Sequence, residues 1–453
     1  MKPRVCEEFA WNWSGSASKA YGDLSLRPPK AQHQPPLISS PSDRLLADRS
    51  SAEVALLQAA FEGPFICHFI LGPSFVDAER GKLYAALSRF PDALLSGFLA
   101  CSGRFLSLMA SETLMIGDGR TDVYAHSARA VKGLREIAIC KTRRDETDLV
   151  VAMVLGLGAV TFNLLDTGSY AHSVCRYTIG LLCTPPLPGE GVPELLEDGL
   201  IPLVFMDTCN CLIRRQVPVF RLGGLGSSQH RRGRDSSMDR YIGLCASLLP
   251  HLYDLCSVSH LIKSNHNMIT AAAEVKLSAI KTAIQEWTPP DQVGGVTRLS
   301  VKEVQVLTAQ ALIYQAAALL LIHRLRFVFG TEDEAADAMA ASILDDISGL
   351  YHVVDDIEQD SGNKGPAPQQ QQRRHFFEYR LGLPFLVAAA ELREQRRRDG
   401  ALDMLDRVVW KKMYPKVGEQ LRRLILYIWE ARDYGWKGNW VDLTLHGPPF
   451  VLF

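Results

Sequence analysis

The chain has 453 residues, of which 47% are hydrophobic and 22% charged, and its formal net charge is −1. This composition is ordinary for a globular protein, and it excludes a chain that is held on nucleic acid by its overall charge. Contact with DNA would require a local patch or a region outside this sequence.

The N-terminal segment differs in composition from the rest of the chain. Residues 14–50 are polar and rich in proline, which predicts a disordered linker. Only residues 1–13, which contain Trp11 and Trp13, look like part of a structured region. No apolar stretch typical of a secretory signal occurs near Met1, so the 10 cysteines are expected to be reduced thiols, most of them buried.

From Ser51 onward the pattern is helical. Apolar residues recur at intervals of three and four, Pro91 and the acids after Thr331 stand where helices begin, and Gly330 stands where one ends. Thr121 or Asp122 is expected to cap the helix that follows. The predicted helices cover residues 78–90, 121–142, 147–165, 170–183, 193–215, 238–249, 252–286, 300–328, a stretch from 331, 380–398 and 401–433. The predicted fold class is all-α, one large multi-helix domain after the linker.

Two apolar runs, residues 149–165 and 304–322, approach the length of a membrane span. The first contains two glycines and an asparagine, and the second is interrupted by three glutamines. We interpret both as buried helices of a large helical domain, and we predict no membrane role.

Metal and phosphate chemistry have weak support in the sequence. Cys209 and Cys211 form a Cys-x-Cys pair, whose members point to different faces of a helix and are expected to be core thiols. The glycines of residues 221–226 and 156–158 do not lie between a strand and a helix, so they do not predict a dinucleotide site. Basic clusters at residues 230–234, 373–374 and 396–398 are typical of solvated surface, with nuclear import or phosphate contact as alternatives. The surrounding segments 216–237 and 361–374 are predicted loops.

A helical terpene-type enzyme is the main enzymatic alternative. Such enzymes hold magnesium with clustered carboxylates, and residues 345–360 supply Asp345, Asp346, Asp355, Asp356, Glu358 and Asp360. The spacing departs from the pattern of those enzymes, because position 359 is Gln and the next acid is Asp360. Their second metal-binding motif is absent from the sequence, so no catalytic residue is predicted and the protein is not expected to be an enzyme.

Three stretches resemble the fungal-specific transcription factor domain, the helical regulatory domain of regulators with a six-cysteine binuclear zinc cluster. They are Tyr314-Gln-Ala-Ala-Ala-Leu-Leu-Leu-Ile-His-Arg-Leu325, Leu383-Pro-Phe-Leu-Val-Ala-Ala-Ala-Glu391, and Tyr427-Ile-Trp-Glu-Ala-Arg-Asp433 followed by Trp440 and Gly447-Pro-Pro-Phe450. The second stretch resembles a helix that continues to a buried acid. Residues 126–135 and 149–165 are similar to the opening helices of the same domain, so the resemblance covers roughly residues 50–453.

The resemblance also extends to the N-terminus. Cys6-Glu-Glu-Phe-Ala-Trp-Asn-Trp13 is similar to the end of a zinc cluster, with Cys6 as its last ligand. One cysteine does not bind two zinc ions, so no cofactor is predicted for these residues by themselves, and zinc is implied only together with the rest of the cluster. The implied division is 1–13 as the end of a zinc-cluster domain, 14–50 as linker and 51–453 as the regulatory domain. Either the rest of the cluster is encoded upstream of Met1, or the protein has lost it.

The resemblance implies a nuclear regulator of transcription, acting on a biosynthetic gene cluster or in a stress or drug response. Its expected partners are DNA, reached only through a missing or partner zinc cluster, the transcription machinery, and a second subunit in a homo- or heterodimer. The alternative from another class is a stand-alone interaction protein that does not bind DNA.

Overall fold

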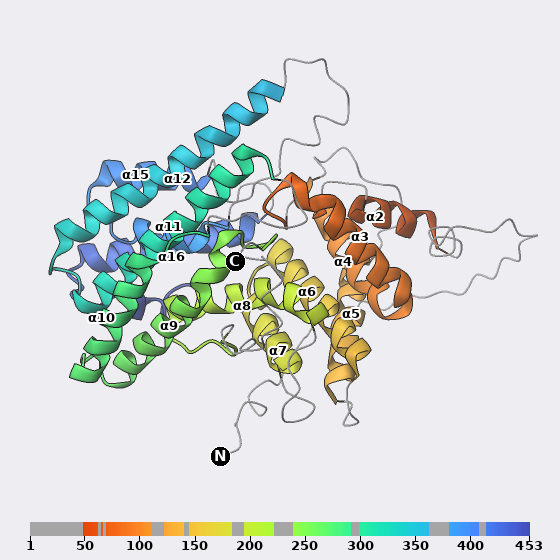
Figure 1. The fold of residues 1–453 in the computed structure, drawn as a ribbon, viewed down its shortest axis with the longest axis horizontal. Coiled ribbons are helices and arrows are strands. Elements are labelled where there is room, and N and C mark those ends of the chain that lie inside the picture. Colours follow the sequence, from red (N-terminus) through yellow and green to blue (C-terminus); the bar gives the residue numbers. More distant parts are fainter. Residues whose placement is uncertain are drawn as a thin grey trace, which may run out of the picture.

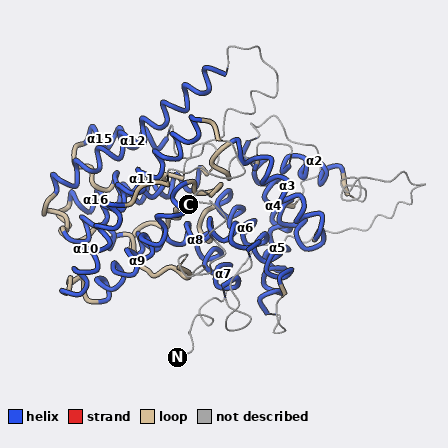
Figure 2. The backbone as a smooth tube through the Cα atoms, viewed as in Figure 1, coloured by secondary structure: helices blue, strands red, loops and turns tan. Residues whose placement is uncertain are grey.

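The computed structural model describes residues 49–61, 65–66, 69–109, 122–139, 145–183, 194–221, 239–290, 299–361, 380–406 and 414–453. The predicted end of a zinc cluster, with Cys6, lies outside these residues, as does the predicted linker except for its last two positions, 49 and 50. Figure 2 shows the described chain as helices joined by loops and turns, and no strand is present in it. The prediction of an all-α fold is confirmed.

The helices follow one another through the whole described chain. Their bounds are α2 Ser51–Phe61, α3 Val76–Arg89, α4 Pro91–Met109, α5 Val123–Ile139, α6 Glu146–Asp166, α7 Ala171–Cys183, α8 Glu194–Arg214, α9 Leu249–Ser264, α10 Ala271–Glu286, α11 Val301–Arg326, α12 Asp333–Ser361, α14 Gly382–Ala389, α15 Gln395–Met404, α16 Pro415–Asp433 and α17 Trp440–Leu443, with short 3-10 helices η2 Pro73–Phe75 and η5 Leu244–Leu248.

The order of the helices in space largely follows their order in sequence. In Figure 1, α2 to α5 lie at one end of the molecule, α6 to α8 in the middle, and α9 to α16 at the other end. Helix α4 packs against α5 and α6, α6 packs against α7, and α11 packs against both α12 and α14. The buried hydrophobic side chains form one cluster that extends from Leu56 to Phe453. The proposed division at residues 13 and 50 stays a prediction.

Several helices begin at caps that are visible in the sequence. The Asp122 carboxylate accepts a hydrogen bond from the backbone N–H of Ala125 at 3.0 Å, which confirms one of the two predicted caps. At the start of α11, Ser300 and Glu303 form a capping box in which each side chain accepts from the other's backbone N–H. These side chains satisfy backbone donors that have no partner inside the helix.

Helix α6 is positioned by a close contact with α7. A Cβ atom added to Gly156 would lie 2.2 Å from the Cγ2 atom of Thr178, so only glycine allows the two backbones to approach this closely. Helices α6 and α11 are long and apolar enough to cross a membrane by length and composition. Inside the structure, 56% of the apolar window of α6 and 61% of that of α11 are buried, which is typical of core helices.

Two predicted helices in the middle of the chain have different boundaries in the structure. The predicted helix over residues 238–249 is wrong at its start, because Asp239 and Gly243 form an antiparallel bridge and only then does η5 begin. The predicted helix over residues 252–286 is two helices, since His266 and Asn267 adopt φ angles of 54° and 63° that end the helical path.

The C-terminal helices were also predicted to be too long. The predicted helix over residues 380–398 is divided between α14 and α15, with a turn after Ala389 that places Glu391 in the core. The predicted helix over residues 401–433 is divided as well, because α15 ends at Met404 and α16 begins with Pro415 in its first turn.

Candidate functional site

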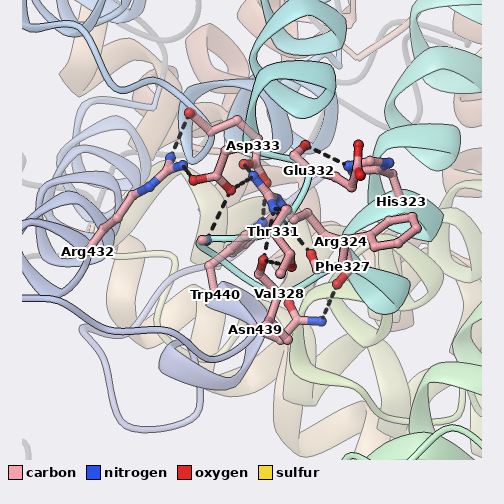
Figure 3. A network of polar contacts seen from close by, with 12 residues as sticks. His323, Arg324, Phe327, Val328, Thr331, Glu332, Asp333, Arg432, Asn439 and Trp440 are labelled. Carbon is pink, nitrogen blue, oxygen red and sulfur yellow. Dashed lines mark hydrogen bonds and ion pairs between the residues drawn. The ribbon is translucent and has the colours of Figure 1, made fainter.

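A buried network of charged side chains joins the C-terminal helices (Figure 3). Its members are Arg324 near the end of α11, Asp333 at the start of α12, Glu391 after α14, Arg432 near the end of α16, and Trp440 at the start of α17. We call these residues the C-terminal network. Four of them come from the three stretches that carry the family resemblance, and the fifth, Asp333, is one of the acids that the sequence predicted only as the start of a helix.

Arg324 is the centre of the C-terminal network, and its side chain is 1% exposed. Its guanidinium lies 2.7 Å from the Oε2 atom of Glu391 and 2.8 Å from the Oδ1 atom of Asp333. Its Nη1 atom also donates to the backbone carbonyls of Phe327 and Thr331, at 3.2 and 3.1 Å. A buried arginine with these partners has its donors satisfied, as burial of a charge requires.

Glu391 has no exposed side-chain surface. It accepts from Arg324 through one oxygen and from the indole N–H of Trp440, at 2.9 Å, through the other. Burial raises the pKa of Glu391 above its ordinary value, against the opposing effect of the Arg324 hydrogen bond. The expectation of a buried acid at the end of the second stretch is confirmed, but the helix ends at Ala389, so Glu391 lies in the turn after it.

Asp333 and Arg432 complete the network. The Oδ2 atom of Asp333 lies 2.9 Å from Arg432, whose guanidinium also lies over the ring of Phe329 at 4.2 Å from the ring centre. Burial opposes the ionisation of Asp333, but hydrogen bonds from Arg432 and Arg324 outweigh it and lower the pKa. Arg432 donates to the backbone carbonyl of Glu391 at 2.7 Å, which links the end of α16 to the turn after α14.

The C-terminal network therefore contains two arginines and two carboxylates that neutralise one another. Each of its ionic groups is bound to groups of a neighbouring helix or turn, and Asn439 adds a further link by donating to the backbone carbonyl of Arg324 at 3.0 Å. This arrangement fixes the relative positions of α11, α12, α14 and α16. The charged groups of the network are already paired with each other, so its role is structural.

A second network of ionic side chains lies between α7 and α8. The Oδ1 atom of Asp207 lies 2.9 Å from the Nε2 atom of His172 and 3.1 Å from the Nη1 atom of Arg176, and the backbone N–H of Val219 donates to its Oδ2 atom at 2.7 Å. The Sγ atom of Cys211 lies 3.3 Å from Asp207. We call His172, Arg176, Asp207 and Cys211 the α7–α8 network.

The α7–α8 network contains a group with metal-ligand chemistry, since ligand atoms of His172, Asp207 and Cys211 lie within 4.8 Å of one another. The Nη1 atom of Arg176 lies 3.0 Å from the Cys211 sulfur and 3.1 Å from Asp207, so a cation is already present there. Burial raises the pKa of the Cys211 thiol, whereas a metal ligand must be a thiolate. The group fits a hydrogen-bonded network and does not fit a zinc site.

The other predicted site residues are distributed as follows. The described cysteines are free thiols, and Cys209 and Cys211 are buried in α8 as expected. Burial raises the pKa values of the Cys209 and Cys211 thiols, so these two cysteines do not fit a zinc cluster, whose ligands are thiolates. Cys6 lies outside the described residues and stays a prediction.

The acidic and basic clusters do not form a common site in the described chain. Asp345 and Asp346 are exposed on α12, and the side chains of Asp355, Asp356, Glu358 and Asp360 lie outside the described part. The basic clusters at residues 230–234 and 373–374 also lie outside it. Of the third cluster, Arg397 pairs with Asp337, and Arg398 is buried against Asp433 and the ring of Trp429.

The α7–α8 network was not predicted from the sequence, although a signal for it exists. His172 and Arg176 are four residues apart on α7, and Asp207 and Cys211 are four residues apart on α8. This spacing places each pair on one face of its helix. Because α7 and α8 are separate segments of the chain, the sequence does not show that these two helix faces meet.

The comparisons with known proteins concern the C-terminal part of the chain. No curated protein and no solved structure matches the chain. The family model described as "Fungal specific transcription factor domain" matches residues 203–453, which include the whole C-terminal network, and the domains of this family are typically non-enzymatic. Since the match covers more than half of the sequence, the chain belongs to the family of fungal specific transcription factor domains.

Proposed function

We propose that this chain is the helical regulatory region of a nuclear transcription regulator and has no catalytic activity of its own. The observation that carries the proposal is the C-terminal network, in which the three stretches that resemble the family's regulatory domain meet. A regulatory domain must present a fixed surface to its partners, and the network supports this by holding four helices in one arrangement.

We propose further that the protein reaches DNA through a zinc cluster, supplied either with Cys6 in a longer chain or by a partner subunit. The formal net charge of −1 supports the assignment of DNA binding to a separate zinc cluster, because the chain as a whole has no excess of basic residues for binding phosphates. The transcription machinery and a second subunit of a homo- or heterodimer are the other proposed partners. The target genes, in a biosynthetic cluster or a stress or drug response, are proposed from the family resemblance.

The proposal is tested by fusing the whole chain to an unrelated DNA-binding domain and measuring a reporter gene in the nucleus. The fusion is expected to change reporter expression relative to the DNA-binding domain alone. Glu391→Ala, which disrupts the C-terminal network, is expected to weaken that change at equal protein level. The matched control is Glu430→Ala on α16, whose side chain is exposed.

Two results would contradict the proposal. One is a reporter signal equal to that of the DNA-binding domain alone, with the fusion shown to be folded and nuclear. The other is magnesium-dependent turnover of a prenyl diphosphate by the purified protein, which would favour the terpene-type enzyme. Binding to a full-length zinc-cluster regulator without any reporter effect would favour the stand-alone interaction protein.

A further inference from the structure

A cavity of about 140 Å³, partly open to solvent, lies where the N-terminal helices meet the region that matches the family. Residues of helices α3, α4, α6 and α8 line it, together with Phe453. Its walls are mainly aliphatic and aromatic side chains, among them Phe98, Leu164 and Met206. A ligand in this cavity would contact both parts of the molecule.

The size and lining of the cavity limit what it can hold. An apolar cavity of about 150 Å³ in a protein core is large enough to bind benzene. Binding sites for small molecules are mostly apolar, with a few polar groups that orient the ligand. The cavity therefore fits one ring or an aliphatic group of similar bulk, together with a polar group that contacts the few polar side chains of the lining.

The lining of the cavity contains one side-chain carboxylate, that of Glu79, and it is already neutralised. Glu79 lies 2.6 Å from the Nε atom of Arg240 through its Oε2 atom, and its Oε1 atom accepts a hydrogen bond from the hydroxyl of Tyr241. Its side chain is 4% exposed. Glu79 thus has a cation and a donor of its own, and it is not available to attract a cationic ligand.

The lining also contains a guanidinium, that of Arg380. The Nη2 atom of Arg380 donates to the backbone carbonyl of Phe69 at 2.9 Å, and its Cζ atom lies 5.9 Å from the ring centre of Tyr241. Within the described part of the chain, no carboxylate forms an ion pair with Arg380. An arginine whose neighbours are a carbonyl and a ring retains donors and a net charge for an anionic group.

We propose that this cavity binds a small carboxylic acid, with its ring or short aliphatic body among the apolar walls and its carboxylate at Arg380. The paired state of Glu79 excludes an amine as the preferred ligand, and the cation of Arg380 favours the acid over a neutral alcohol. This site goes beyond the proposed function and does not depend on it, because binding is measured on the purified protein without a reporter.

The test compares three compounds of one shape with the purified full chain by calorimetry or ligand-observed NMR. The compounds are 3-phenylpropionate, 3-phenylpropan-1-ol and 3-phenylpropylamine, which differ only in the terminal group. A hydrogen bond to a charged group contributes enough to predict that the acid binds about tenfold more tightly than the alcohol. The amine is expected to bind most weakly.

Variants of the cavity separate the two parts of the proposal. Arg380→Gln is expected to abolish the preference for the acid while leaving the alcohol's affinity unchanged, and Arg380→Lys is expected to keep part of the preference. Arg393→Gln, at an exposed position away from the cavity, is the matched control. Val154→Phe adds volume at a lining residue of α6 and is expected to abolish binding of both compounds.

Circular dichroism checks that each variant remains folded. Equal affinities for the acid and the alcohol would overturn the assignment of Arg380, as would an unchanged acid preference in Arg380→Gln. Binding that survives Val154→Phe unchanged would place the ligand elsewhere and overturn the cavity as its site. Absence of binding by all three compounds would overturn the proposal as a whole.

Discussion

The C-terminal network and the α7–α8 network are both buried and ionic, but they differ in their access to water. In the C-terminal network, Arg324 is 1% exposed and Glu391 is fully buried. In the α7–α8 network, Asp207 is 1% exposed, whereas the side chain of Arg176 is 34% exposed. An arginine that can turn toward water tolerates the loss of its acid, and an enclosed arginine does not.

The two networks also differ in their place relative to the family match. The C-terminal network lies entirely within residues 203–453, whereas the α7–α8 network joins Asp207 and Cys211 inside the match to His172 and Arg176 outside it. The first therefore holds the matched region together, and the second attaches the N-terminal helices to it. Breaking each network is expected to affect different parts of the molecule.

The largest effect is expected from Glu391→Ala. The substitution leaves two buried arginines against the single carboxylate of Asp333, and removing one partner of a buried ion pair costs about 3–5 kcal/mol. The free energy of unfolding from urea denaturation measures the loss. Glu430→Ala, on an exposed face of α16, is the control and is expected to stay within about 0.5 kcal/mol of the unmodified protein.

A smaller loss, about 2 kcal/mol, is expected from Asp207→Ala, measured in the same way. His172 and the backbone N–H of Val219 lose their acceptor, but the partly exposed Arg176 can be solvated instead. A loss equal to or greater than that of Glu391→Ala would show that access to water does not distinguish the two networks.

The sequence predicted much of the helical framework, because the signals are local. Pro91, Asp122 and the acids after Thr331 mark helix starts that the structure confirms within one or two residues. The break between α9 and α10 was missed because His266 and Asn267, not a glycine, adopt the positive φ angles. Such a conformation in non-glycine residues is decided by surrounding contacts, such as the hydrogen bond from Arg215 to Asn267.

The candidate site was only partly predictable. The resemblance pointed to the stretches that contain Arg324, Glu391, Arg432 and Trp440, and it led to the expectation of a buried acid at Glu391. Which side chains meet depends on how the helices pack, and no pattern within one stretch contains that information. The turn after α14 illustrates this, because residues 391–398 have the composition of a continuing helix and the chain nevertheless turns there.

A third prediction concerns the coupling of Asp333 and Arg432. A double-mutant cycle with Asp333→Ala and Arg432→Ala is expected to give a coupling free energy of about 1–2 kcal/mol, because the two groups are in direct contact and mostly enclosed. The control cycle uses Lys132 and Glu136, an exposed pair four residues apart on α5, and is expected to give less than about 0.5 kcal/mol. Equal coupling in the two cycles would mean that burial does not strengthen the Asp333–Arg432 contact.

The smallest effect is a difference in the pH at which each network loses stability. Burial lowers the pKa of His172 below 6.5, so the unfolded chain takes up this proton first, and stability falls as the pH decreases through 6.5. The pKa values of Asp207 and Asp333 are below 3.8: burial opposes this shift, and hydrogen bonds from His172 and from Arg432, respectively, outweigh it. Their contributions are present above 3.8 and are lost as the pH falls below that value.

These three groups therefore predict that the unfolding free energy decreases in two steps on acidification, the first near pH 6.5 and the second below about pH 4. Glu391, whose pKa burial raises, acts in the opposite direction as it takes up its proton. His172→Gln keeps a donor for Asp207 and is expected to reduce the first step without changing the second. The first step does not vanish, because burial, followed by the charge of Arg129, also lowers the pKa of His126. His446→Gln, at an exposed position, is the control and is expected to leave both steps unchanged. If His172→Gln keeps a first step of the same size as the unmodified protein, the α7–α8 network is not the source of that step.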